Sequence, residues 1–74
     1  MIYVRRFKDV TEEVRCGNKK EALKKAIRDW ALGEFIPQNI KDDNGKEVIG
    51  HAELRHYLLK TTGLKEFRRS DLWN

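Results

Sequence analysis

The chain has 74 residues, of which 39% are hydrophobic and 38% are charged. This length suits one domain and is too short for two. A domain of this size buries only about 60% of the surface of its unfolded chain, so little protein is left to enclose a deep catalytic cavity. We therefore expect any binding site to be an exposed face or a shallow groove.

Sixteen Lys and Arg residues against twelve Asp and Glu residues give the chain a formal charge of +4. The basic excess lies at both ends, since residues 1–33 and 51–74 are net positive and residues 34–50 are net negative. An excess of this size permits nucleic-acid binding but does not require it.

Cys16 is the only cysteine, so the chain cannot form the internal disulfides that stabilise small secreted domains. Residues 1–8 contain no apolar run of signal-peptide length, and no stretch of about 18 apolar residues occurs in the sequence. These features predict a cytoplasmic protein with no membrane partner.

The first segment of the chain has the composition of two strands. Residues 2–8 are rich in β-branched and aromatic side chains. In residues 10–16, apolar side chains alternate with polar ones, which is typical of a second strand, with Asp9 at the turn between the two. The alternative for this segment is a helix start, because Thr11-Glu12-Glu13-Val14 also has the residues of a capped first helical turn.

A long helix is predicted from about Lys19 to Leu32. Asn18 can cap it, and Glu21, three residues later, completes a capping box. Gly33 follows as a residue that can take the left-handed conformation of a C-cap. One stripe at helical spacing is apolar and consists of Ala22, Leu23, Ala26, Ile27, Trp30 and Ala31. The solvent-exposed side is predicted to hold Glu21, Lys24, Lys25, Arg28 and Asp29.

Residues 36–41 and 46–49 flank the turn Asp42-Asp43-Asn44-Gly45 and are predicted to form a hairpin. Pro37 has no backbone N–H, so we expect it at a strand start or an edge.

Two loop lengths are possible for this hairpin, namely two residues, or three residues with a bulge at Gly45. The longer loop is favoured because it places Lys41 opposite Glu47 and thereby pairs opposite charges. It also sets Ile40 across from Val48.

A second helix is predicted from about His51 to Thr61, with Gly63 as its end. Its apolar stripe consists of Leu54, Tyr57, Leu58 and Thr61. Leu59 falls on the far side of that stripe, and the following tail contains further large apolar residues that could cover it.

Together these elements predict an α+β fold in the order ββαββα, with two hairpins forming an antiparallel sheet that is packed with two helices. Residues 1–74 are predicted to be one small domain, and residues 64–74 a C-terminal tail or extension.

The residues of catalytic and metal sites are sparse. Cys16, His51 and His56 are the only soft metal ligands, and a structural zinc site needs four. The acidic turn at residues 42–45 lacks the ligand spacing of a calcium loop. The five glycines are scattered singly, so no phosphate-binding loop is present. We therefore predict no catalytic residue, metal or cofactor, and a protein that is not an enzyme and has no small-molecule substrate.

Two functional hypotheses remain. The first is a regulatory or adaptor protein, of phage or mobile-element type, that binds a protein partner or forms a homodimer through a sheet edge or its apolar tail. The residues predicted for that contact are Leu59, Phe67, Leu72 and Trp73. The alternative is a small basic module that binds nucleic acid through Arg5, Arg6, Lys8, Lys19, Lys20, Arg68 and Arg69.

Overall fold

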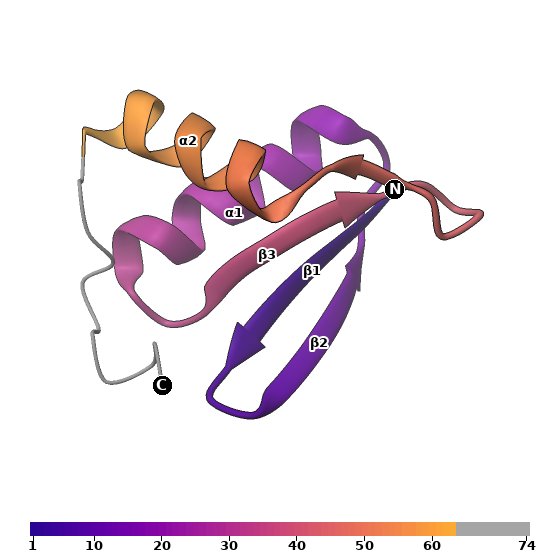
Figure 1. Ribbon diagram of the computed structural model, residues 1–74, viewed down its shortest axis with the longest axis horizontal. Helices are drawn as coiled ribbons and strands as arrows, with labels where there is room; N and C mark the ends of the chain where they lie inside the picture. Colours follow the sequence, from indigo (N-terminus) through magenta and orange to yellow (C-terminus); the bar gives the residue numbers. More distant parts are fainter. Residues whose placement is uncertain (64–74) are drawn as a thin grey trace.

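A computed structural model describes residues 1–63, in which the chain forms four strands and two helices (Figure 1). In chain order these are β1 (Ile2–Phe7), β2 (Val10–Arg15), α1 (Lys19–Leu32), β3 (Ile36–Lys41), β4 (Glu47–Ile49) and α2 (His51–Thr62). The α+β class and the ββαββα order predicted from the sequence are confirmed. The segment after Asp9 is a strand, so the alternative of a helix start there is wrong.

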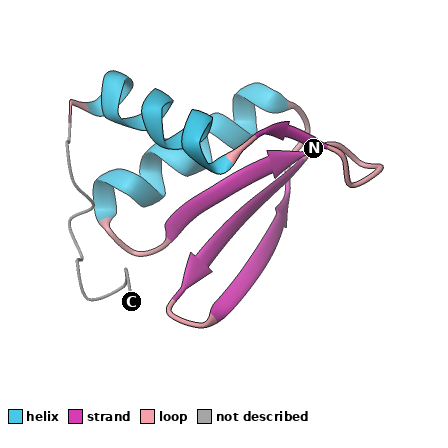
Figure 2. Cartoon of the chain, in the orientation of Figure 1, coloured by secondary structure: helices cyan, strands magenta, loops and turns pink. Residues whose placement is uncertain are grey.

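The four strands form one antiparallel sheet in the order β2-β1-β3-β4. Figure 2 shows both helices on the same side of this sheet. Helix α1 packs on β1 and β3, and α2 packs on β3 and α1. Among the described residues, β2 is an outer strand, and the main contacts of both helices lie on the other strands.

The hydrophobic core lies between the sheet and the two helices. Tyr3, Ile40 and Ile49 are paired across three neighbouring strands, so their side chains share one face of the sheet. The buried cluster consists of these three residues together with Ala22, Ala26, Trp30, Ile36, Leu54 and Leu58. The predicted stripe of α1 is thus confirmed as the side of the helix that faces the core.

The ends of α1 form as their residues predict. Asn18 Oδ1 accepts a 2.9 Å hydrogen bond from the Glu21 N–H. The Glu21 carboxylate in turn accepts a 2.7 Å bond from the N–H of Gly17, one residue earlier than in the usual capping box. Gly33 has φ 73° and donates its N–H to the Asp29 carbonyl, which ends the helix.

A two-residue turn joins β1 to β2. Phe7 pairs with Val10, and Lys8 and Asp9 form the turn between them, as predicted for Asp9. Lys8 has φ 53°, a backbone conformation that residues other than glycine rarely adopt. Arg6 donates a 2.7 Å hydrogen bond to the Lys8 carbonyl and thereby supports this conformation.

The hairpin of β3 and β4 has the longer of the two predicted loops. Lys41 pairs with Glu47, and Gly45 has φ 85°. The predicted pairing of Ile40 with Val48 is wrong, because a bulge after Ile40 shifts the register and places Ile49 opposite it. The bulge therefore buries Ile49 and leaves Val48 exposed.

Helix α2 begins at the predicted residue and ends one residue later than predicted. Its stripe is only half confirmed, since Leu54 and Leu58 are buried whereas Tyr57 and Thr61 are exposed. The reason is that α2 lies at the border of the molecule and buries a narrow face against β3 and α1. Leu59 is half-buried and packs against the core.

Replacing Trp30 by alanine should lower the free energy of unfolding by about 3–5 kcal/mol, because Trp30 is a large side chain buried on α1. Urea unfolding followed by circular dichroism measures this change. The control is Leu32→Ala on the same helix, which should change stability by less than about 0.5 kcal/mol because Leu32 is 52% exposed. Equal effects of the two substitutions would contradict the central position of Trp30.

Candidate functional site

A carboxylate of α1 is buried against β1. Asp29 is only 4% exposed. It accepts a 2.7 Å hydrogen bond from the Tyr3 hydroxyl and bonds of 3.2 and 3.4 Å from the Arg5 guanidinium. The predicted exposure of Asp29 is therefore wrong. Burial of this carboxylate is possible because the two donors on β1 replace the water that it loses.

Arg5 extends this contact to the second strand. Its Nε and Nη2 atoms donate to Glu12 Oε1 at 3.2 and 2.6 Å, and its guanidinium lies 3.9 Å from the centre of the Phe35 ring. Burial by itself lowers the pKa of Arg5, but the hydrogen bonds with Glu12 and Asp29 outweigh burial and raise that pKa above its ordinary value. Arg5 is thus held as a permanent cation between two carboxylates.

Tyr3 is held in its neutral form. Burial, followed by the negative charge of Asp29, raises the pKa of the Tyr3 hydroxyl far above its ordinary value. The phenol therefore keeps its proton and remains a hydrogen-bond donor to Asp29. We call Tyr3, Arg5 and Asp29 the buried polar network. Its contact with the exposed Glu12 connects β1 and α1 to β2.

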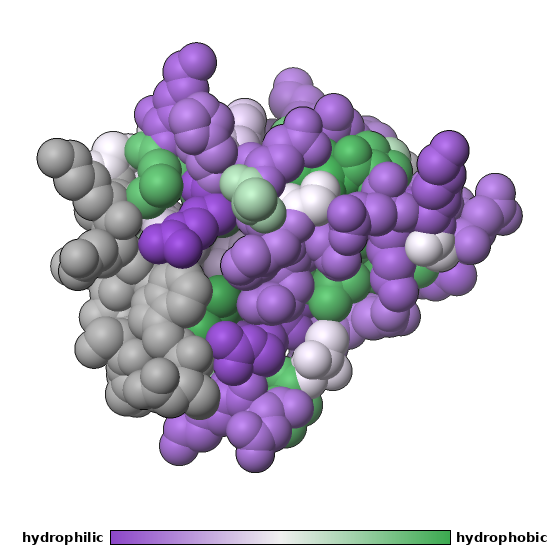
Figure 3. All heavy atoms as spheres, in the orientation of Figure 1, coloured by the Kyte–Doolittle hydropathy of each residue, from purple (hydrophilic) through white to green (hydrophobic). Residues whose placement is uncertain are grey.

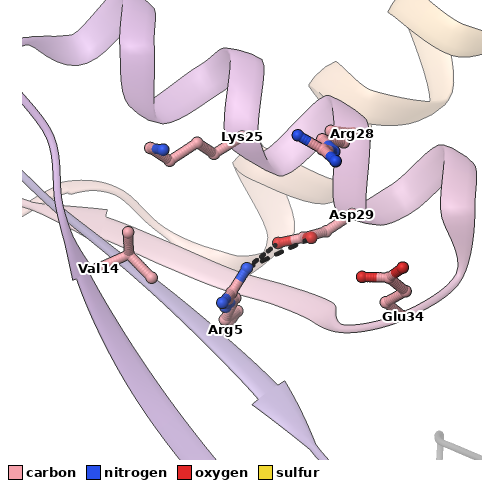
Figure 4. A pocket seen from close by; sticks show the side chains of 6 residues that line it. All are labelled: Arg5, Val14, Lys25, Arg28, Asp29 and Glu34. Atoms are coloured by element: carbon pink, nitrogen blue, oxygen red, sulfur yellow. Dashed lines mark hydrogen bonds and ion pairs between the residues drawn. The ribbon is translucent and has the colours of Figure 1, made fainter.

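A groove lies beside this network, between α1 and β2. It has a cavity volume of about 250 Å³, and its lining residues are Arg5, Val14, Lys25, Arg28, Asp29 and Glu34. Figure 4 shows Lys25 and Arg28 on α1 across the groove from Arg5 and Val14, with Glu34 at one end. Within residues 1–63, no hydrogen bond or ion pair engages the side chains of Lys25 and Arg28. Within the described part of the chain, these two cationic groups of the groove are therefore unpaired.

The outer edge of β2 is the second component of the site. No other strand among residues 1–63 pairs with it. Cys16 donates its N–H to the Met1 carbonyl at 2.9 Å, and hydrogen-bonded pairs alternate along an antiparallel ladder. The backbone N–H and C=O groups of Thr11, Glu13 and Arg15 therefore point away from β1, towards the open edge.

The inner side of β2 is exposed as well. Val10 is 64% exposed and Val14 is half-buried, because both helices pack over other strands. On the face drawn in Figure 3, the described residues are mostly hydrophilic, and the apolar side chains form separate spots. The open backbone of β2, rather than a broad apolar surface, is therefore the distinctive feature of the site.

The structure does not gather the residues of the nucleic-acid hypothesis into one surface. Arg5 is held in the buried polar network, and Arg6 and Lys8 lie at the turn that joins β1 to β2. Lys19 and Lys20 begin α1, at the opposite end of β1 from that turn (Figure 1). Arg68 and Arg69 lie outside the described residues.

Of the residues predicted for protein binding, only Leu59 lies in the described part of the chain, where it is half-buried against the core. Phe67, Leu72 and Trp73 lie outside the described residues. Their role in binding stays a prediction.

Within residues 1–63, no group of three or more His, Cys, Asp or Glu side chains could hold a metal ion. Cys16 follows β2, whereas His51 and His56 lie on α2. Neither helix in this part of the chain is long and apolar enough to cross a membrane.

Sequence reasoning missed the groove and the burial of Asp29. One signal could have identified the buried carboxylate, because Asp29 follows Ala22 by seven residues and Ala26 by three, which places all three on one face of a helix. The groove carried no comparable signal, since its two walls come from segments whose packing is not evident in the sequence.

No protein-family model, no curated protein and no solved structure matches this chain. Its function must therefore be inferred from its own residues.

Replacing Asp29 by alanine should lower the free energy of unfolding by about 3 kcal/mol, because it leaves the Tyr3 hydroxyl and the Arg5 charge without their shared acceptor. Thermal and urea unfolding measure this change. Glu34→Ala is the matched control, because it removes an exposed carboxylate from the same groove and should cost less than about 0.5 kcal/mol. If Asp29→Ala were as stable as the wild type, the buried polar network would not hold α1 on the sheet.

Proposed function

We propose that this chain is a small, non-enzymatic binding protein that adds a strand of a partner protein to the edge of β2. The observation that supports this proposal is the six-residue strand β2, which has an open outer edge among the described residues and an exposed Val10 on its inner side. An open edge of this kind is a template for another strand, because its outward N–H and C=O groups form the missing half of a ladder.

The groove beside β2 would supply selectivity. Backbone hydrogen bonds provide affinity for any extended segment, whereas side-chain contacts distinguish one segment from another. Val10 and Val14 offer apolar contacts to alternate side chains of the added strand. Lys25 and Arg28 offer charged contacts, and the cavity of about 250 Å³ has room for a side chain.

The proposal includes the biological setting that composition suggests. The chain would act by contact, as a regulator or adaptor in the cytoplasm, of phage or mobile-element type. Its small size supports a role of this kind, since one shallow groove and one strand edge are sufficient for a binding module. The tail residues Phe67, Leu72 and Trp73, together with Leu59, would form a further contact region.

Thr11→Pro should abolish binding to the partner while the domain stays folded. Proline removes the N–H of Thr11, which points to the open edge and is not used in the ladder with β1. The measurement compares the proteins retained from nuclease-treated lysate by immobilised wild-type and variant chains, with circular dichroism as the check on folding.

Thr11→Ala is the matched control, because it removes the same side chain and keeps the N–H. We expect Thr11→Ala to retain the proteins that the wild type retains. If folded Thr11→Pro also retained them, strand addition at β2 would be excluded.

A second candidate function, binding of a nucleic-acid backbone, is favoured by one observation. Lys25 and Arg28 lie about one turn apart on α1 and have no partner within residues 1–63. Cations of this kind bind phosphate oxygens and release the counterions of the nucleic acid.

In this second case, affinity for a mixed-sequence oligonucleotide should fall steeply as salt rises. Replacing Lys25 and Arg28 together by glutamine should reduce the slope of log K against log salt by about 2, since about one counterion is released for each phosphate contact. Fluorescence anisotropy measures both quantities. Lys46→Gln, in the exposed loop between β3 and β4, is the control that should leave the slope unchanged. The absence of binding at low salt would exclude this function.

A further inference from the structure

We propose that the partner at the β2 edge is a second copy of this chain, paired antiparallel with the first about a twofold axis that passes beside Glu12. This inference rests on the proposed use of the β2 edge and adds the identity of the occupant.

The alternation of the strand limits how two copies can pair. The outward backbone groups of β2 belong to Thr11, Glu13 and Arg15, so these residues must face one another across the new ladder. With the axis at Glu12, Thr11 of one copy faces Glu13 of the other. The same alternation keeps the helices of both copies on one side of the joined sheet. An antiparallel ladder between two copies can therefore form with its backbone hydrogen bonds in place.

Side chains in this register are complementary. Val10 lies opposite Val14 of the second copy, which pairs two exposed or half-buried apolar side chains on the inner face of the sheet. Arg15, at the end of β2, comes next to Asp9 of the second copy, a turn residue just before that strand, so opposite charges lie close to each other there. Twofold symmetry produces each of these pairs twice.

Glu12 would face its own symmetry mate, and like charges directly opposite one another are unfavourable. Each Glu12 carboxylate, however, already accepts two hydrogen bonds from Arg5 of its own chain, the shorter at 2.6 Å. Each Glu12 carboxylate would therefore meet its symmetry mate with a guanidinium of its own chain beside it, which reduces the repulsion between the two.

The neighbouring registers are less favourable. A shift of the axis to Thr11 places Asp9 opposite Glu13 and Val10 opposite Glu12 of the second copy. A shift to Glu13 places Glu12 opposite Val14 and loses the pairing of Val10 with Val14; the two Glu13 side chains then meet, each beside Lys41 of its own chain. An axis midway between two neighbouring residues would place residues whose backbone groups point outward opposite residues whose backbone groups point towards β1. The hydrogen bonds of a ladder could then not form. Charge and apolar complementarity thus select the axis at Glu12.

Joining two copies in this way also adds neighbours along the inner side of β2. The two grooves become continuous between the two α1 helices, and Val10 and Val14 gain apolar neighbours from the second copy.

The first test is sedimentation velocity of the full chain over a wide range of protein concentration. We expect the wild type to dimerise and Thr11→Pro to remain a monomer. Arg15→Asp and Asp9→Arg should each weaken dimerisation about tenfold, because each turns two attractive pairs per dimer into repulsive ones. The double variant Asp9→Arg/Arg15→Asp restores opposite charges and should dimerise as the wild type does. Both positions are exposed, so these variants are expected to fold.

The second test reads the register directly. In a Cys16→Ser background, Glu12→Cys places two thiols directly opposite one another at the axis, within about 4.5 Å between their Cα atoms, and mild oxidation should join them. Val10→Cys is the matched control, since its thiol lies about four residues along the ladder from its symmetry mate and should not form the disulfide. Non-reducing electrophoresis distinguishes the two results.

The possible outcomes separate this inference from the proposal on which it rests. If the wild type stays monomeric at every concentration and Thr11→Pro still fails to retain proteins that the wild type captures, the partner is not a second copy. Strand addition at β2 would then remain supported. The inference is also overturned if Thr11→Pro dimerises as the wild type does. It is likewise overturned if Val10→Cys forms the disulfide between copies more readily than Glu12→Cys. Rescue by the double charge variant, together with the Glu12→Cys disulfide, supports it.

Discussion

The fold depends on one buried carboxylate. Asp29 loses its hydration on α1 and regains hydrogen bonds only where the Tyr3 hydroxyl and the Arg5 guanidinium of β1 reach it. This requirement fixes the position of α1 along β1, and Arg5 then carries the constraint to Glu12 on β2. Because removing one partner of a buried ion pair is costly, Arg5 and Asp29 stabilise the packing of α1 on β1. The contact with the exposed Glu12 adds less to stability.

The same constraint leaves the outer strand β2 open at one edge of the sheet. With Asp29 held over β1, α1 packs on β1 and β3, and α2 packs on β3. The main contacts of both helices therefore lie away from β2, and the groove forms between α1 and this outer strand. An open strand edge promotes association with other chains, and proteins commonly protect such an edge or use it. The charged side chains of Glu13 and Arg15 limit indiscriminate pairing at β2, whereas a complementary partner would satisfy them.

The two candidate functions make different demands on the basic residues. Binding of a nucleic-acid backbone needs cations that lie along one surface, and the structure separates Lys19 and Lys20 from Arg6 and Lys8 by the length of β1 (Figure 1). Addition of a strand needs only an open edge and a shallow groove, which lie next to each other at β2. This difference is why protein binding is the function that we favour.

What the sequence determined by itself was local. The ends of α1 at Asn18 and Gly33 and the loop that ends at Gly45 were predicted correctly, because caps and tight turns depend on residues within about four positions of one another. The burial of Asp29, the pairing of Ile40 with Ile49 through a bulge, and the exposed position of β2 in the sheet were decided only by the tertiary structure. Each of these depends on contacts between segments far apart in the chain. A helical pattern identifies an apolar face, but only the fold supplies the donors that allow a carboxylate to be buried on it.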